Sequence, residues 1–148
     1  MKRFSFRLQR VLELKERIRD ERRQELVLKN LERDRAQQHL EHLEQEYSQA
    51  QISEGGTYSA SDLLLLGNYS ARLKEEIAQQ LIRVEEAQRA ADEARESYIE
   101  ASKESQAMEK LKERRKQEHQ EQELKELGDQ LDEFGVQRAV RRAQASGK

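Results

Sequence analysis

The chain has 148 residues, of which 39% are charged and only 5% aromatic, so it holds too little large apolar material for a thick globular core. It contains no proline, a residue that destabilises a helix interior by about 3 kcal/mol. It also contains no cysteine, which excludes disulfides and zinc sites built on thiolates.

The excess of Ala, Glu, Lys, Leu, Arg and Gln is typical of long helices and coiled coils. The longest apolar run is four leucines at 63–66, whereas a membrane-spanning helix needs about 20 apolar residues. The first residues are basic and lead into Arg7 and Arg10 rather than into the apolar core of a signal peptide. We therefore expect a cytosolic protein without direct membrane insertion, held at a membrane only through a partner.

A first helix is predicted over residues 4–52, because apolar residues recur there at alternating spacings of three and four. This stripe comprises Phe4, Leu8 and either Val11 or Leu12 near its start, and Ala36, Leu40, Leu43, Tyr47 and Ala50 near its end. Between residues 15 and 25, the polar Lys15, Arg19 and Arg22 occupy the extrapolated positions, which indicates a shift of register.

Residues 53–60 predict a reversal of the chain. Paired glycines at 55 and 56, flanked by serine and threonine, supply the backbone freedom that a turn requires. Residues 59–62 (SASD) then have the form of a capping box, in which a serine and an acidic side chain satisfy backbone N–H groups at a helix start.

A second helix is predicted over residues 61–142, with a sustained stripe at the same spacing. The stripe comprises Leu73, Ile77, Gln80, Val84, Ala87, Ala91, Ala94, Tyr98, Ala101, Ser105 and Met108. Bulky residues of the first stripe facing this small-residue stripe would bring the two helix axes close together. At 63–66 the leucines run around the helix and cannot all face one stripe, so they either pack locally at the turn or form a partner patch.

Two apolar stripes joined by a short turn can bury each other. The expected fold class is therefore all-α, with two long helices in an antiparallel coiled-coil hairpin that forms a single domain over residues 1–148. Folding at residue 56 places Phe4 opposite Met108, so the second helix overhangs the N-terminus from about residue 109. The overhang has its own stripe of Leu124, Leu127, Leu131 and Phe134. Two glycines, at 128 and 135, interrupt it at about 1 kcal/mol each, so we expect the overhang to fray alone and to order on a partner.

Charge is distributed unevenly along the chain. Residues 1–35 hold twelve Lys and Arg against seven Asp and Glu, residues 36–109 hold six against fifteen, and residues 110–148 hold ten against eight. The hairpin would bring the two basic ends together and leave an acidic half around the turn.

Neither a metal site nor a catalytic site is predicted. His39 and His42 have Glu46 one turn on, but no Glu-x-x-His pair or thiolate accompanies them, so surface histidines are the preferred interpretation. A two-helix hairpin offers no concavity to desolvate a substrate, and the paired glycines lack the Gly-Lys-Ser/Thr ending of a phosphate loop. We expect no catalytic residue, no cofactor and no enzyme activity.

Residues 4–16 (FSFRLQRVLELKE) resemble the start of the FliJ family of flagellar export proteins, and residues 108–115 (MEKLKERR) resemble its second recurring segment. The length, the two-helix layout and the overhang are similar as well. The resemblance implies a non-catalytic stalk or adaptor of the bacterial flagellar type III export apparatus. Its implied partners are the hexameric export ATPase, a membrane export gate protein and export chaperones, through which it would be held at the cytoplasmic face of the inner membrane.

The resemblance and the charge distribution together indicate two binding surfaces. The terminal end of the hairpin would bind the ATPase through Phe4, Leu8, Arg10, Arg114, Arg115, Leu124, Leu127, Leu131 and Phe134. By resemblance, the gate-binding stretch corresponds to Tyr69, Leu73, Glu76 and Gln80, although Glu76 and Gln80 depart from the small and histidine residues of the family.

Two alternatives stay open. One is a related non-flagellar secretion stalk or a generic coiled-coil scaffold, in which the Phe-x-Phe-x-Leu block is not expected. The other is a binder of nucleic acid or of a membrane surface, suggested by the basic residues at 110–116 and 138–142. Interleaved acidic residues favour a solvated helix instead, so nucleic acid is not an expected partner.

Overall fold

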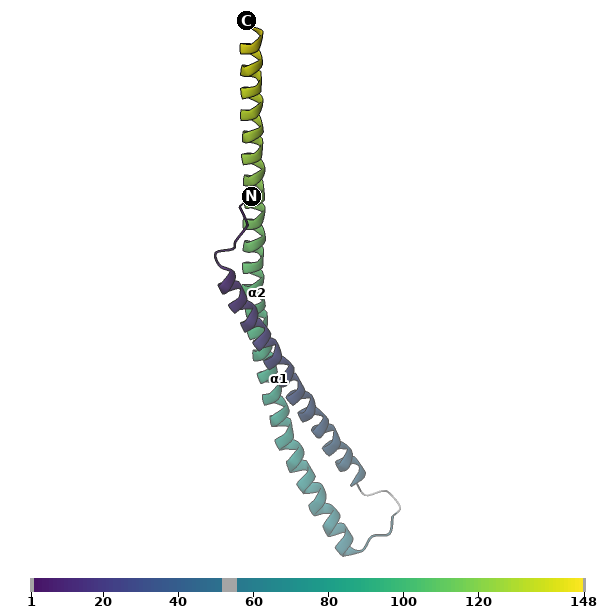
Figure 1. The fold of residues 1–148 in the computed structure, drawn as a ribbon. Helices are drawn as coiled ribbons and strands as arrows, with labels where there is room; N and C mark the ends of the chain where they lie inside the picture. The colour runs from purple at the N-terminus through teal and green to yellow at the C-terminus, as the bar shows by residue number, and fades with distance from the viewer. Residues whose placement is uncertain (1, 52–55, 148) are drawn as a thin grey trace. The chain divides into compact units, whose positions relative to one another are not determined.

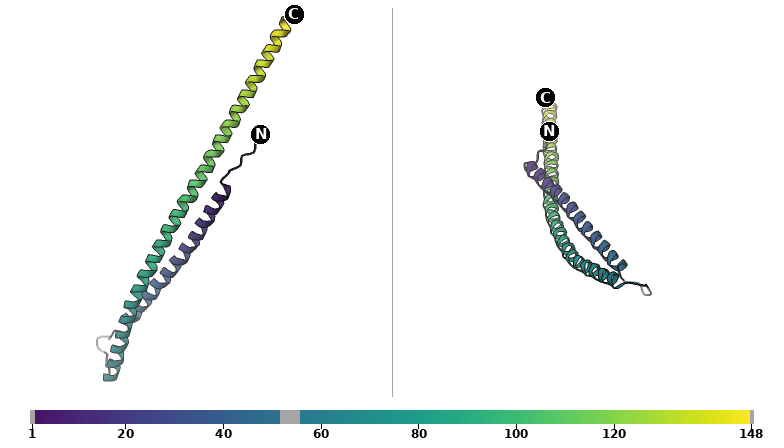
Figure 2. Two further views of the ribbon diagram at one scale, coloured as in Figure 1. Left: turned by 90° about the vertical axis from the view of Figure 1, so that its left-hand side faces the viewer. Right: turned by 90° about the horizontal axis from the view of Figure 1, so that it is seen from below.

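The computed structural model describes residues 2–51 and 56–147. It contains two helices, α1 (Gln9–Gln49, 41 residues) and α2 (Ala60–Ser146, 87 residues), and these described residues form no strand (Figure 1). The helices run antiparallel as a hairpin with α2 the longer, which confirms the predicted fold class (Figure 2). Three residues of the predicted turn, 53–55, lie outside the described residues, as does residue 52 at the predicted end of the first helix.

Helix α1 begins at Gln9 and not at Phe4 as predicted. The N–H of Gln9 donates to the carbonyl of Phe6 at 3.1 Å, and that of Leu12 donates to Leu8 at 2.9 Å. Residues 4–7 alternate instead, with Phe4 and Phe6 half-buried and the residues that follow each of them exposed. Alternation is the period of extended chain, which places both rings on one side, whereas a helix would point them in different directions.

Helix α2 begins with the predicted capping box. The N–H of Asp62 donates to the Ser59 hydroxyl at 3.1 Å, and the N–H of Ser59 donates to the Asp62 carboxylate at 3.2 Å. The Ser59 hydroxyl also donates to this carboxylate at 2.7 Å. These hydrogen bonds, first that from the hydroxyl and then that from the backbone, lower the pKa of Asp62 below its ordinary value of 3.8. The first turn of α2 is thus satisfied by local contacts.

The predicted stripe of α2 is confirmed throughout. Each of its eleven residues from Leu73 to Met108 is buried or half-buried, and Ser105 is completely buried. On α1 the matching residues Leu12, Leu40 and Leu43 are buried. Because small side chains dominate the α2 stripe between residues 87 and 105, the core there is thin, as the composition predicts.

The register shift predicted in α1 is wrong. Burial continues at the same three-four spacing through Lys15 and Arg19, whose side chains are 33% and 29% exposed, and then through Leu26, Lys29 and Arg33. Long basic side chains can lay their aliphatic stems along an apolar surface while their charged heads reach water. The stems of Lys15 and Arg19 fit a position that faces the small residues of α2. The charged residues therefore do not require a shift in the register of α1.

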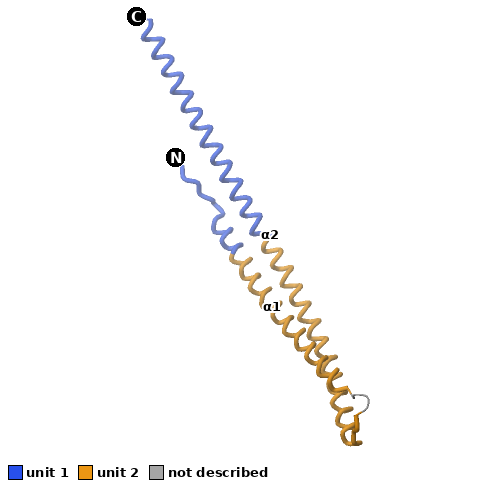
Figure 3. Tube along the Cα trace, turned by 90° about the vertical axis from the view of Figure 1, so that its right-hand side faces the viewer, with its two compact units in different colours: residues 1–16, 103–148 blue, residues 17–102 orange. Residues whose placement is uncertain are grey.

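The chain divides into two compact units (Figure 3). The first, here the terminal unit, comprises residues 1–16 and 103–148, and the second, here the turn unit, comprises residues 17–102. In the turn unit, Gln80 Nε2 donates to the Ala36 carbonyl at 2.9 Å and Lys74 Nζ lies 5.7 Å from the centroid of the Tyr47 ring. In the terminal unit, Lys15 Nζ pairs with Glu104 Oε2 at 2.6 Å.

Phe4 lies beside His119. The sequence had predicted a position opposite Met108, and that prediction is wrong. The two rings meet edge to face, with centroids 5.6 Å apart and an interplanar angle of 65°. Extended residues advance about 3.3 Å each against 1.5 Å in a helix, so the non-helical start reaches further along α2. The overhang therefore begins near residue 120 rather than near residue 109.

Helix α2 continues through Gly128 and Gly135 and ends at Ser146, beyond the predicted end at residue 142. A Cβ added at either glycine would have no atom within 4 Å, so both positions are open to solvent. The glycines therefore leave the backbone of α2 accessible without ending the helix.

Candidate functional site

The terminal unit contains all nine residues predicted to bind the ATPase. Sixteen Lys and Arg and twelve Asp and Glu give this unit a net charge of +4, whereas twelve and eighteen give the turn unit −6. The difference in sign predicted from the sequence therefore holds for the units as they fold. The nine residues fall into three groups, one at the N-terminal end of the chain and two along α2.

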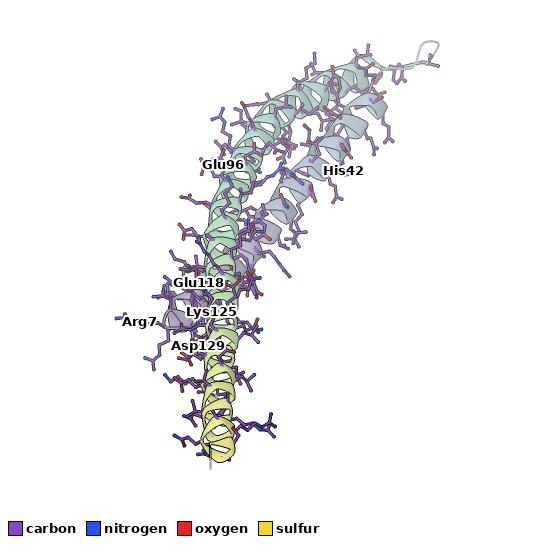
Figure 4. All side chains as sticks on the ribbon, turned by 90° about the horizontal axis from the view of Figure 1, so that it is seen from above. Arg7, His42, Glu96, Glu118, Lys125 and Asp129 are labelled. Atoms are coloured by element: carbon purple, nitrogen blue, oxygen red, sulfur yellow. The ribbon has the colours of Figure 1, made fainter. Side chains whose placement is uncertain are left out.

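The first group lies on the N-terminal segment. Phe4 is half-buried against His119, while Leu8, just before α1, and Arg10, in its first turn, are exposed. Arg7 is exposed as well, and its side chain points away from α2 (Figure 4). This segment thus offers a partner both apolar and cationic side chains.

The second group is the arginine pair at 114 and 115. Arg114 Nε lies 3.4 Å from one carboxylate oxygen of Glu118, and Arg115 Nη1 lies 3.2 Å from the other. The two arginine side chains are 78% and 63% exposed. Exposed ion pairs of this kind contribute about 0–1 kcal/mol, so both arginines can exchange Glu118 for a partner carboxylate at little expense in stability.

The third group is the overhang stripe, defined as Leu124, Leu127, Leu131 and Phe134. All four side chains are exposed, and Leu131 and Phe134 are 67% and 68% exposed. Among the residues that the structure describes, no helix covers this part of α2, whose side chains stand out on all sides around Lys125 and Asp129 (Figure 4). Four large apolar residues in water along one helix are typical of a partner-binding face.

The charge around the overhang stripe was not predicted. Residues 118–133 hold seven Asp and Glu against one Lys, whereas residues 110–116 hold five Lys and Arg against one Glu. Averaged over residues 110–148 the charge is basic, and this average hides an acidic stretch of about four turns. A shorter charge window would have found it.

A shallow groove lies beside the first residues of the N-terminal segment. Lys2, His119, Glu123, Glu126 and Leu127 line it, together with Gln122 and Gln130. Lys2 therefore lies near the start of the acidic stretch.

The four residues predicted to bind the export gate lie in the turn unit, and the structure separates them into two kinds. Leu73 and Gln80 are only 2% and 4% exposed, because both sit in the stripe that packs on α1. Tyr69 is exposed, and Glu76 accepts a hydrogen bond from Arg72 Nε at 3.1 Å. Only Tyr69 and Glu76 present side chains that a partner could reach.

Leucines near the start of α2 extend the exposed surface around Tyr69. Leu64 and Leu65 are 68% and 67% exposed, whereas Leu66 is half-buried. Leu65 and Tyr69 are four residues apart and so share one face of the helix. This pair, which we call the Leu65–Tyr69 patch, favours the partner-patch interpretation over local packing for these two residues.

A further exposed apolar group on α1 was missed. Val27, Leu28 and Leu31 lie within about one turn on the outer side of the helix, and all three are exposed. They fall outside the three-four stripe, and only a search for apolar residues off the stripe would have detected them.

Metal ligation and membrane insertion find no support in the described ranges 2–51 and 56–147. His42 Nε2 lies 3.0 Å from Glu46 Oε1, but no group of three or more His, Cys, Asp or Glu side chains is placed to hold a metal ion there. No helix in the same ranges combines the length and the apolar character needed to cross a bilayer.

Comparison with known proteins gives one match. The model of the family described as the flagellar FliJ protein matches residues 4–144, which include α1 and all but the last two residues of α2. No curated protein and no solved structure matches the chain.

Proposed function

Because the chain belongs to the FliJ family of flagellar proteins, which are non-enzymatic and export-related, we propose that it is the stalk of the flagellar type III export apparatus. The terminal unit binds the hexameric export ATPase, and the turn unit binds the membrane export gate. Export chaperones are further partners, and these contacts hold the protein at the cytoplasmic face of the inner membrane.

The observation that carries this proposal is the partition of the predicted residues between two units of opposite net charge. Every residue assigned to the ATPase lies in the terminal unit, and every residue assigned to the gate lies in the turn unit. A linker between two different partners needs two separate surfaces, whereas a generic scaffold does not. Mutations in one unit should therefore leave the function of the other intact.

Within the turn unit, the gate contact falls to Tyr69 and Glu76, extended by Leu65. Leu73 and Gln80 support this contact indirectly, because both hold α2 against α1. Buried residues act through the position of the exposed ones, so substitutions at Leu73 test stability and binding together. The Leu65–Tyr69 patch is the cleaner target.

The test compares two double variants of the full chain. Arg114→Glu with Arg115→Glu is expected to weaken stimulation of the export ATPase and to leave gate binding intact. Leu65→Ala with Tyr69→Ala is expected to spare ATPase stimulation and to impair gate binding and motility. Arg83→Glu with Arg89→Glu, an equal charge change in the turn unit, serves as the control for net charge. Equal loss of both activities in both variants would contradict the proposal.

The alternative of a nucleic-acid or anionic-membrane binder is addressed in the same preparation. Binding of DNA or of anionic vesicles that falls steeply with salt would favour it. The acidic stretch at 118–133 opposes such binding, because its carboxylates lie between the two basic segments and repel a polyanion that approaches them.

A further inference from the structure

The overhang stripe is not a continuation of the hairpin core. The stripe of α2 that packs on α1 runs through Ser105 and Met108 and continues to the half-buried Lys112 and His119. At about 100° per residue, the four residues of the overhang stripe are turned by roughly 130° on average from the line of His119 and Gln122. Leu124 to Phe134 therefore lie mostly on another side of α2 than His119, and Leu127 at the edge of the stripe lines the groove beside Lys2 and His119.

The rotation shows that the stripe was not left bare simply because α1 is short. If α1 were longer, it would extend along Gln122, Glu126, Asp129 and Glu133, which continue the spacing of the packed stripe and are polar or acidic. The large apolar residues lie elsewhere on the helix. They form a second face, which the chain's own hairpin geometry does not use.

Two glycines border this second face. Gly128 and Gly135 are seven residues apart and lie on the same edge of the overhang stripe, next to Leu124 and Leu131 on the helix surface. No atom lies within 4 Å of a Cβ built at either position. Each glycine destabilises a helix by about 1 kcal/mol relative to alanine, and both leave backbone exposed where another backbone can approach closely.

The charges around this face indicate which kind of partner surface would fit it. Glu121 borders the stripe on the glycine edge, and Glu123 borders it on the other edge. Asp132 lies within about 20° of Glu121 around the helix and borders the same glycine edge, whereas Asp129 lies on the opposite side of the helix. A surface that covers this face must therefore present apolar side chains at its centre and basic side chains at its margins.

We propose that residues 118–137 form a docking helix whose overhang stripe enters an apolar groove with a basic rim, and that the partner backbone approaches α2 at Gly128 and Gly135. The identity of the partner rests on the proposed function, which makes it the export ATPase. Binding by this end then uses two surfaces of opposite charge. The arginines at 114 and 115 meet acidic groups of the partner, and the docking helix meets basic ones.

The decisive variant fills the glycine positions. Gly128→Gln with Gly135→Gln is expected to raise the helicity of α2, because glutamine is the better helix former, and yet to weaken binding to the purified export ATPase by about tenfold or more. A role of the glycines in helix stability alone would strengthen binding or leave it unchanged. Gly67→Gln, at an equally open position in the turn unit, is the matched control and is expected to keep wild-type affinity.

Two further comparisons test the stripe and its rim. Leu127→Ser with Leu131→Ser is expected to reduce affinity by about tenfold or more while the exposed positions leave folding intact. Glu121→Lys, at the edge of the stripe, is expected to weaken binding several-fold more than Asp129→Lys, which makes the same charge change on the opposite side of the helix. Affinity is measured by calorimetry with the full chain.

The outcomes separate this inference from the proposed function. If the wild-type chain binds the ATPase and the glutamine and serine variants bind equally well, the docking helix is wrong and the stalk stands. If Glu121→Lys strengthens binding, the rim of the groove is acidic and the stated partner chemistry is wrong. If the wild-type chain does not bind the ATPase at all, both the proposed function and the docking helix are overturned.

Discussion

Gln80 of α2 donates a hydrogen bond from Nε2 to the carbonyl oxygen of Ala36 in α1 at 2.9 Å, at a point where Gln80 is only 4% exposed. A polar side chain on the packed stripe of a coiled coil is satisfied in one register and unsatisfied in the neighbouring ones. The contact therefore selects the alignment of the two helices within the turn unit.

Replacing Gln80 separates stability from register. We expect Gln80→Ala to lower the free energy of unfolding by about 1 kcal/mol, from the lost hydrogen bond. Gln80→Leu is expected to match or exceed wild-type stability and to broaden the alignment of the helices. Urea denaturation measures the first effect. Spin labels on His39→Cys and Ala78→Cys, both exposed in a chain without native cysteine, measure the second as a distance distribution. A distribution as narrow as that of wild type in Gln80→Leu would show that packing alone selects the register.

The capping box predicts a pH dependence. The pKa of Asp62 is lowered in the folded chain, chiefly by the Ser59 hydroxyl, so the carboxylate stabilises the folded state above its ordinary pKa of 3.8. This contribution is lost as the pH falls through the lowered value. Ser59→Ala is expected to return the pKa of Asp62 toward 3.8 and to destabilise the chain at pH 7 by about 1 kcal/mol. Carboxyl chemical shifts followed by NMR between pH 7 and pH 2 report the titration. If the pKa of Asp62 in the variant stays as low as in the wild type, the assigned cause is wrong.

Burial distinguishes Leu73 from Leu65. Leu73→Ala removes a side chain that is 2% exposed and is expected to destabilise the chain by about 2–4 kcal/mol, with some relief because a two-helix interface can close around the gap. Leu65→Ala, at a position 67% exposed, is expected to change stability by less than about 0.5 kcal/mol. Thermal unfolding followed by circular dichroism checks both. Similar losses in the two variants would mean that Leu65 is covered in solution.

Phe4 anchors the extended N-terminal segment through its edge-to-face contact with His119. Phe4→Ala is expected to release this segment and to move the His119 ring protons toward their free chemical shifts, while the helicity of α1 from Gln9 onward stays unchanged. Phe4→Tyr keeps the aromatic ring and serves as the control. Loss of α1 helicity in Phe4→Ala would show that the segment nucleates the helix rather than merely docking on α2.

The sequence predicted which side chains are exposed where local pattern was sufficient. The exposed stripe from Leu124 to Phe134 was identified, because it depends only on spacing along one helix. The burial of Leu73 and Gln80 followed from the same spacing, because both belong to the predicted α2 stripe, and it conflicts with their assignment to the gate by resemblance. The acidic character of the overhang was missed because charge was averaged over too long a segment.

Local interactions explain what could be predicted about the fold. Helix formation, the capping box of Ser59 and Asp62, and the long stripe of α2 each depend on residues within a few positions of one another, so the sequence alone determined them. The absence of proline made the length of α2 predictable in the same way.

Contacts between distant segments required the tertiary structure. The position of Phe4 beside His119, the burial of Lys15 and Arg19 on the packed stripe, and the rotation of the overhang stripe away from that side depend on how two helices align. Alignment is set by the sum of many small packing and hydrogen-bonding terms between residues far apart in the chain. Several alignments share the same three-four spacing, and only the folded hairpin selects among them.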